Sequence, residues 1–233
     1  MGRSRHRSDR RAGEAIDRRQ TARHEGGGEV EPPELRGIHV NMPGAIPPEI
    51  DQASSVGSAA PPGLTADERG SYEQLVFFYK HVYYAFEMGT RPQTLTGLAD
   101  SPIGLATFLL DHDARSLELI ARSFDGQTEG ITPNDFLDNV TLFWLTNTGV
   151  SAARLYWENK LAFFRPKGVK VPTAVSVFPD ELYQTPRNWA ERAYPNLIHY
   201  NKVAKGGHFA AWEQPKLFAE EVRAGFRSLR EAN

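Results

Sequence analysis

Two strand-like segments near the C-terminus, each followed by a helical pattern, limit what this chain can fold into. Residues 169–178 are rich in β-branched side chains, and a helix around Arg187–Ala193 separates them from a second strand over 197–203. A final helix is expected over 215–230, and a short strand over 37–42 opens the ordered part. Because strands that alternate with helices form a parallel sheet covered on both faces, the sequence predicts an α/β fold.

A long helical insertion separates the first predicted strand from the second. Thr65 and Glu68 are spaced as in a capping box, which predicts a helix directly after them. Asp100-Ser101-Pro102 and Thr132-Pro133 start two further helices, because proline is tolerated in the first turn of a helix. Helical periodicity continues from Ser151 to Phe164, so the insertion is expected to span 65–165.

These patterns divide the chain into four parts. Residues 1–36 are expected to be a disordered or unrelated tail, since Met1 to Val30 holds eight arginines and almost no large apolar residue. Two other interpretations of this tail are a transit peptide, which its acidic residues disfavour, and a reading-frame artefact. Residues 37–64 are expected to be a strand and a linker of the core, 65–165 a helical lid, and 166–233 the C-terminal α/β core.

Composition narrows the class of protein. The chain has 233 residues, a formal net charge of -2, 40% hydrophobic residues and no cysteine. This balance predicts a globular cytoplasmic protein with no general attraction to nucleic acid, and no apolar run is long enough to span a membrane. Neither a phosphate-binding glycine loop nor a metal-ligand spacing of histidines occurs, so we expect no cofactor and no metal.

The residues most capable of chemistry follow the two C-terminal strands. His208 comes directly after Gly206-Gly207, and Asp180 and Glu181 lie just beyond the strand that ends at Phe178. Because the ends of adjacent parallel strands meet, an acid and a histidine can pair here as a general base. The plainer alternatives are a histidine in a surface loop and two acids that cap the following segment.

A nucleophile to accompany that base is not evident. The sequence contains no Gly-x-Ser-x-Gly elbow and no equivalent elbow built on aspartate. Tyr84 and Tyr156 are candidate hydrogen-bond donors to an oxygen that gains charge. Most single tyrosines are packing residues, however, and spacing alone does not distinguish these two from the eight in the chain.

Several segments together resemble the epoxide hydrolases of the α/β-hydrolase fold, specifically the microsomal-type branch, over roughly residues 37–230. The matching segments are Gly37-Ile38-His39-Val40-Asn41-Met42-Pro43, Thr90-Arg91-Pro92-Gln93-Thr94, Asp100-Ser101-Pro102-Ile103-Gly104-Leu105-Ala106, Ser151-Ala152-Ala153-Arg154-Leu155-Tyr156, Pro172-Thr173-Ala174-Val175, Phe178-Pro179-Asp180-Glu181-Leu182 with Thr185-Pro186, and Gly206-Gly207-His208-Phe209-Ala210-Ala211.

The resemblance implies a reaction and a role for each candidate residue. In that family an aspartate attacks the epoxide and forms an ester, and a histidine–acid pair then activates water to release a diol. His208 resembles the base and Glu181 its acid partner, with Asp180 the less favoured neighbour. Tyr156 and Tyr84 resemble the two lid tyrosines that donate to the epoxide oxygen, although Tyr83 adjoins Tyr84. The implied partner is a small hydrophobic epoxide.

One departure from the family pattern is large. The family's His-Gly-x-Pro segment and its Gly-Gly-Asp-Trp-Gly elbow are both missing from the sequence. We therefore expect the C-terminal part of an incomplete α/β-hydrolase fold, with an exposed sheet edge, that is inactive alone. The alternatives are a non-catalytic protein that binds a ligand or a partner, and a related esterase or dehalogenase. Homo-oligomerisation is left open.

Overall fold

A computed structural model describes residues 34–158 and 163–231 of the chain. Its sheet contains the strands β1 (Ile38–Val40), β2 (Thr173–Val177) and β3 (Leu197–Lys202). The strands lie in the order β1-β2-β3 and both pairings are parallel. Every residue of β2 is buried, as expected for the central strand. The parallel α/β sheet predicted from the sequence is therefore confirmed, and no strand among the described residues pairs with the outer edge of β1.

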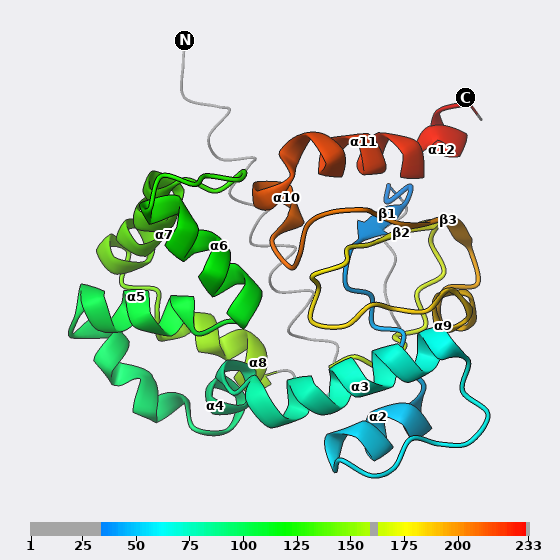
Figure 1. Cartoon of the computed structure of the whole chain (residues 1–233), viewed down its shortest axis with the longest axis horizontal. Coiled ribbons are helices and arrows are strands. Elements are labelled where there is room, and N and C mark those ends of the chain that lie inside the picture. The colour runs from blue at the N-terminus through cyan, green and yellow to red at the C-terminus, as the bar shows by residue number, and fades with distance from the viewer. Residues whose placement is uncertain (1–33, 159–162, 232–233) are drawn as a thin grey trace.

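Helices cover both faces of the sheet. The C-terminal helices α11 (Pro215–Gly225) and α12 (Arg227–Glu231) lie along one face, while α9 (Arg187–Ala193) and α3 (Ala66–His81) lie on the other (Figure 1). The helix α2 (Pro48–Ser55) packs against α3. The short helix α10 (Ala210–Glu213) leads from the third strand into α11.

The remaining helices form a separate group beside the sheet (Figure 1). They are α4 (Tyr84–Thr90), the 3-10 helix η1 (Pro92–Ala99), α5 (Pro102–Leu110), α6 (Ala114–Phe124), α7 (Pro133–Leu145), the 3-10 helix η2 (Ser151–Ala153) and α8 (Arg154–Glu158). The predicted continuation from Ser151 to Phe164 is observed up to Glu158. Residues 159–162 lie outside the described residues, and Phe163 and Phe164 form a turn, so the prediction of helix is wrong at these two residues. The predicted tail over 1–36 likewise lies outside them as far as residue 33.

The helix starts read from the sequence are present. Thr65 and Glu68 form a reciprocal capping box at α3, and Thr132 forms another with Asp135 at α7. The Ser101 hydroxyl accepts from the Gly104 amide at α5. Each bond satisfies an amide that the first helical turn leaves without a partner.

The hydrophobic core is divided into clusters that match this arrangement. One cluster joins α2, α3 and α9 beneath the sheet and is centred on Leu75 and Trp189, which are almost completely buried. A second lies within the α4–α8 group and includes Leu105, Ile120 and Phe136. Each cluster holds its own set of helices together, so the α4–α8 group does not depend on the sheet for its core.

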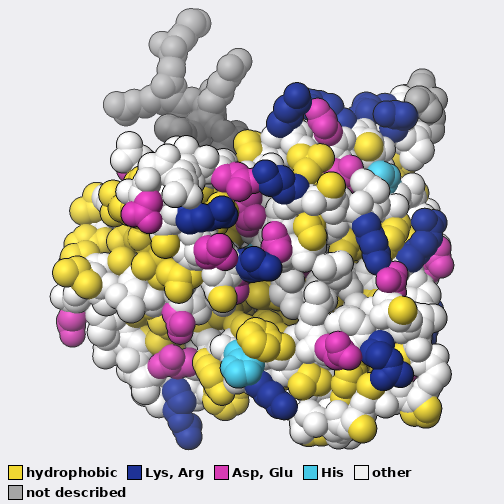
Figure 2. Space-filling view, viewed as in Figure 1, with side chains coloured by type: hydrophobic (Ala, Val, Ile, Leu, Met, Phe, Trp, Pro, Cys, Tyr) yellow, Lys and Arg dark blue, Asp and Glu magenta, His cyan; other side chains and the backbone are white. Residues whose placement is uncertain are grey.

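Hydrophobic side chains also remain at the surface of the α4–α8 group. Ile103 of α5 and Leu142 and Leu145 of α7 are each more than half exposed. Figure 2 shows hydrophobic side chains gathered over this part of the molecule, whereas charged side chains are more frequent over the sheet and its helices. The apolar residues of these helices are therefore divided between an inner and an outer face.

A polar network fastens α11 to the sheet. The Ser176 hydroxyl of β2 donates to Glu221 at 2.7 Å and meets His39 Nε2 at 3.0 Å. His199 and Asn201 of β3 reach the same carboxylate at 3.2 and 2.8 Å. Because a buried carboxylate is costly without partners, these bonds specify how the helix sits on the sheet.

Two expectations about local structure are wrong. The linker expected within 37–64, at 51–64, is partly helical. Residues 51–55 belong to α2, because Ile50 and Ser54 lie on one helical face and are buried against α3. The expectation that Tyr84 ends the helix that starts after Thr65 is also wrong. That helix stops at His81, Val82 is extended, and Tyr84 begins α4. β-Branched and aromatic residues are poor helix formers, which explains the break.

Candidate active site

The turn that carries His208 is shaped by glycine. Gly206 has a φ of +109°, which L side chains rarely adopt, and a Cβ on Gly207 would lie 3.0 Å from the Asp180 carbonyl oxygen. The Asp180 amide donates to the Gly206 carbonyl at 3.1 Å, so the two loops continue the pairing of β2 with β3. This contact brings the residues after both strands together at the carboxyl edge of the sheet.

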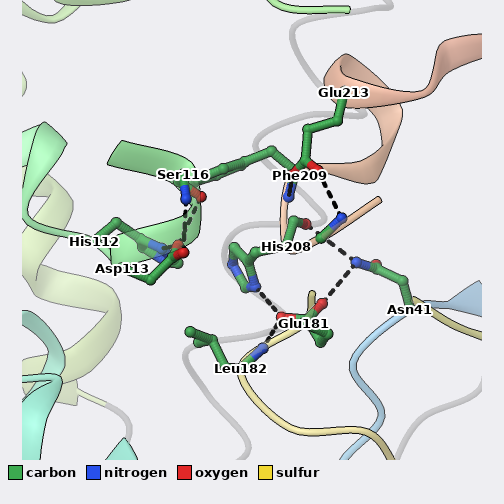
Figure 3. A network of polar contacts seen from close by, with 10 residues as sticks. Asn41, His112, Asp113, Ser116, Glu181, Leu182, His208, Phe209 and Glu213 are labelled. Carbon is green, nitrogen blue, oxygen red and sulfur yellow. Dashed lines mark hydrogen bonds and ion pairs between the residues drawn. The ribbon is translucent and has the colours of Figure 1, made fainter. Parts of the chain in front are cut away.

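His208 and Glu181 form a close pair at this edge. His208 Nδ1 lies 2.6 Å from Glu181 Oε1 (Figure 3). The Glu181 side chain is 0% exposed and that of His208 is 21% exposed. Since the carboxylate accepts, Nδ1 carries the proton and Nε2 is left as an acceptor. The predicted acid–histidine juxtaposition therefore exists, and Glu181 is the acid that makes it.

The environment of His208 favours its charged form. Burial of the ring opposes protonation, but the hydrogen bond and charge of Glu181, together with the charges of Asp113 and Glu213, outweigh burial. The pKa of His208 is consequently raised above its usual value. A histidine in this setting accepts a proton readily and is stabilised once it has done so.

Two residues that hold the pair in place were not predicted from the sequence. Asn41, just after β1, donates to Glu181 Oε2 and to the His208 carbonyl, both at 3.2 Å. The Glu213 carboxylate accepts from the amides of Gly207 at 2.6 Å and Phe209 at 2.9 Å (Figure 3). Glu213 is the last residue of α10 and stands four residues after Phe209, which caps the start of that helix. This helical spacing was the one signal in the sequence that could have suggested its role.

Asp180 lies apart from this pair. Its carboxylate is 3.7 Å from Arg115 of α6, and both side chains are largely exposed. An exposed ion pair of this kind contributes little to stability. Asp180 therefore faces the α4–α8 group rather than the imidazole.

His208 lies at the wall of an apolar cavity of about 660 Å³ between the sheet and the α4–α8 group. Apolar side chains from this group dominate the lining, among them Leu98, Leu105, Ile120, Phe136, Phe143 and Leu155. Tyr84 and Tyr156 also line it, as does Asn41. A cavity of this size, lined mainly by apolar side chains with a few polar groups, suits a hydrophobic small molecule.

The two tyrosines lie side by side in that wall. Their ring centroids are 5.8 Å apart and the rings are perpendicular. Burial, and next its neighbour Tyr156, raises the pKa of Tyr84. Burial also raises the pKa of Tyr156, and a hydrogen bond from Tyr84 partly offsets this. Both phenols remain protonated at neutral pH. Tyr156 can donate a hydrogen bond into the cavity, and Tyr84 can do so once its hydroxyl turns away from Tyr156.

Comparison with known proteins gives relatives of one kind. A putative epoxide hydrolase of Stigmatella aurantiaca is 38% identical over 210 residues, which cover 86% of this chain and 43% of that protein. Epoxide hydrolase 1 of Oryctolagus cuniculus is 31% identical over 207 residues, covering 82% of this chain and 45% of the relative. No family model matches the chain.

Solved structures point the same way. The juvenile hormone epoxide hydrolase of Bombyx mori superposes with a TM-score of 0.64 at 26% identity, over 85% of this chain and 50% of that one. The epoxide hydrolase of Aspergillus niger gives a TM-score of 0.61 at 25% identity, over 83% of this chain and 46% of that one. The chain belongs to the epoxide hydrolase family of the α/β-hydrolase fold. It spans half or less of the length of these relatives.

Two further observations bear on this epoxide hydrolase homologue. Among residues 34–158 and 163–231, no group of three or more His, Cys, Asp or Glu side chains is arranged to hold a metal ion. In the same ranges no helix combines the length and the apolar character needed to cross a membrane.

Proposed function

We propose that this chain provides the water-activating base and the epoxide-holding tyrosines of an epoxide hydrolase, which converts an epoxide and water into a vicinal diol. The observation that carries the proposal is the shared cavity, because Tyr84, Tyr156 and His208 line the same apolar space, and Glu181 holds the imidazole from its buried side. The homology supports it, since the relatives are epoxide hydrolases or putative ones.

The proposed first step depends on the tyrosines. A small hydrophobic epoxide binds in the apolar part of the cavity, with its ring oxygen at the Tyr84 and Tyr156 hydroxyls. When a carboxylate attacks a ring carbon, the C–O bond breaks and negative charge develops on that oxygen. The phenols stabilise this charge by donating to it. The tyrosines also favour epoxide opening over ester or halide chemistry. The oxygen that leaves the attacked carbon of a three-membered ring stays attached to the product, so it needs hydrogen-bond donors within the cavity.

The proposed second step depends on His208. Nε2 takes a proton from water, and the resulting hydroxide attacks the ester carbonyl. The ester C–O bond then breaks, and the imidazolium returns its proton to the leaving oxygen. The second proton of the water passes to the former ring oxygen, so the diol leaves with the carboxylate and the neutral histidine restored. The imidazolium formed in this way is held by Glu181 through Nδ1. Glu181 keeps its two oxygens in place through the Leu182 amide and Asn41.

The proposed organisation follows the four parts predicted from the sequence. Residues 65–165 act as a lid that supplies the tyrosines, 166–233 form the core that supplies the histidine and acid, 37–64 join the two, and 1–36 take no part. The helix α3 also packs into the cluster beneath the sheet through Tyr72, Leu75 and Phe78, so we infer that it anchors the lid to the core.

The sequence supplies no candidate for the carboxylate that attacks the epoxide. A Gly-Gly-Asp-Trp-Gly elbow does not occur in the 233 residues. We therefore infer that this stretch alone does not form the ester and has no turnover. The reaction is proposed for this chain when it is combined with a family nucleophile segment.

A fusion tests the proposal. The segment of the Stigmatella aurantiaca relative that precedes its matched region is joined to this chain, and diol formation from styrene oxide is followed by chromatography. We expect the fusion to form diol and the 233-residue chain alone to form none. Tyr156→Phe in the fusion should lower the rate about 10²-fold, whereas Tyr83→Phe should leave it unchanged. A folded fusion without turnover, or turnover by the unfused chain, would contradict the proposal.

A second candidate function is binding without catalysis. It is favoured by one observation, namely that the apolar cavity is formed by described residues alone although the sequence holds no nucleophile elbow. In this case an epoxide or its diol should raise the melting temperature of the unfused chain. A fusion that binds such ligands and still forms no diol would favour this second function over the first.

Location and assembly are also proposals. We place the reaction in the cytoplasm, since a chain without cysteine needs no oxidising compartment. Fractionation of cells that express the tagged chain tests this location. Light scattering after gel filtration tests whether the chain forms homo-oligomers.

A further inference from the structure

A second histidine–carboxylate pair lies beside the first. His112 Nδ1 is 2.6 Å from Asp113 Oδ2 in the turn between α5 and α6, and the His112 side chain is 14% exposed. In the sequence, His112 is one of the histidines that show no metal-ligand spacing, and no role is expected for it. In the structure His112 lines the same apolar cavity as His208.

Asp113 gives His112 a fixed anchor. Its carboxylate caps α6 by accepting from the Ser116 amide at 2.8 Å and from the Ser116 hydroxyl at 2.7 Å. Burial tends to raise the pKa of Asp113, but the bonds from His112 and Ser116 outweigh it and hold the value at about 2. The ionised carboxylate accepts, so His112 carries its proton on Nδ1 and presents Nε2 as an acceptor.

The His112 ring connects the two parts of the proposed site. Its centroid is 4.4 Å from that of His208 with 33° between the planes, and 4.9 Å from that of Tyr84 with 30° between them. Phe209 adds a third contact at 5.0 Å. The His208 ring is also oriented by a single hydrogen bond from Nδ1 to Glu181, and the ring can still rotate about that bond. A flat neighbour against its face removes that freedom.

We propose that His112 is a positioning residue, which fixes the ring planes of His208 and Tyr84 and so sets the base and the epoxide donor relative to each other. Asp113, which is fixed at the start of α6, holds His112 in this position through the bond to Nδ1. The assignment of what His112 positions rests on the proposed function, whereas the packing itself does not.

The role can be separated from helix stability. The cap of α6 is the bond from the Ser116 amide to Asp113, and it does not involve His112. Replacing His112 therefore leaves the cap in place. His112→Phe keeps a flat ring without the Nδ1 donor, while His112→Asn keeps a donor near Asp113 without the ring.

The test is a proton NMR measurement on the whole 233-residue chain. The reporter is the low-field Nδ1–H resonance of His208 in its bond to Glu181, assigned by its absence from His208→Gln. We expect this resonance to be sharp in the wild type, broadened or lost through exchange with water in His112→Ala and His112→Asn, and retained in His112→Phe. His81→Ala removes an exposed histidine that stacks on Phe77 and should change nothing.

Two outcomes overturn the proposal. One is a folded His112→Ala chain whose His208 resonance is as sharp as in the wild type. The other is a resonance lost from His112→Phe as fully as from His112→Asn, because a retained ring would then not restore the order. If His112→Ala fails to fold, the Phe and Asn variants decide alone. Since no turnover is measured, failure here is distinct from failure of the proposed hydrolysis.

Discussion

The bond between His208 and Glu181 is the residue-scale feature with the largest expected consequence. Glu181→Gln removes the charge that raises the pKa of His208, so that pKa should fall. A histidine with a raised pKa stabilises the fold fully below about pH 6.5 and loses that contribution as pH rises through its folded value. The variant should therefore lose about 1.5–3 kcal/mol of unfolding free energy at pH 5.5 and much less at pH 8.5.

Urea unfolding at the two pH values measures this difference. Glu220→Gln on exposed α11 surface is the matched control and should change the unfolding free energy by less than about 0.5 kcal/mol at either pH. A loss of equal size at pH 5.5 and pH 8.5 would show that the carboxylate does not act through the charge of His208.

The site residues that the sequence revealed are those that directly follow predicted parallel strands. His208 and the acids Asp180 and Glu181 were found because they follow β-rich segments, and parallel neighbours bring such ends together. The choice of Glu181 over Asp180 came from the resemblance to epoxide hydrolases. Asn41 and Glu213 were missed because each acts through contacts made only in the folded chain. His112 was missed for the same reason, since nothing in Asp111-His112-Asp113 says that the ring meets His208.

The turn after β3 is the decisive element for placing His208. Gly206→Ala puts a side chain at a φ of +109° and a Cβ 3.0 Å from Phe178 Cδ1. We expect a loss of about 2–4 kcal/mol in unfolding free energy, because backbone strain and a steric clash add. Gly63→Ala is the control, as Gly63 has a φ of +82° with open space around it, and about 1 kcal/mol is expected there.

The two glycine variants are compared by chemical denaturation. The larger loss in Gly206→Ala should come with a weaker His208 Nδ1–H resonance, because the Asp180–Gly206 contact aligns the two loops. Equal losses in the two variants would mean that positive φ alone matters and that the packing of the turn on Phe178 does not.

Elements were easier to predict where local signals agree. Thr65–Glu68 and Thr132–Asp135 gave the starts of α3 and α7 because capping is decided within one turn. The helix α2 escaped notice because its region is rich in Pro, Ser and Ala, and it is stabilised by tertiary contacts from Asp51 to Tyr79 and Arg165. The break before Tyr84, which turns that phenol into the cavity, is marked in the sequence only by Val82 and Tyr83, which are weak helix formers rather than strong breakers.

At the scale of the whole molecule, the chain combines a three-stranded parallel sheet with a helical group that has its own core. The cavity and the proposed catalytic side chains lie where these two parts meet. The alternation of elements in the sequence was enough to predict the sheet and the insertion. It could not predict the cavity, because that depends on how the α4–α8 group packs over the sheet edge.

The measurement that tests the central claim most directly is the mass of the fused protein after incubation with styrene oxide. In the His208→Gln fusion the ester should form but not be hydrolysed, so the protein should gain the mass of one epoxide, and diol formation should fall about 10²–10⁴-fold. The unsubstituted fusion and its His81→Gln control should form diol without a lasting adduct. Diol formation by His208→Gln at the unsubstituted rate, with no adduct, would contradict the assignment of His208 as the water-activating base.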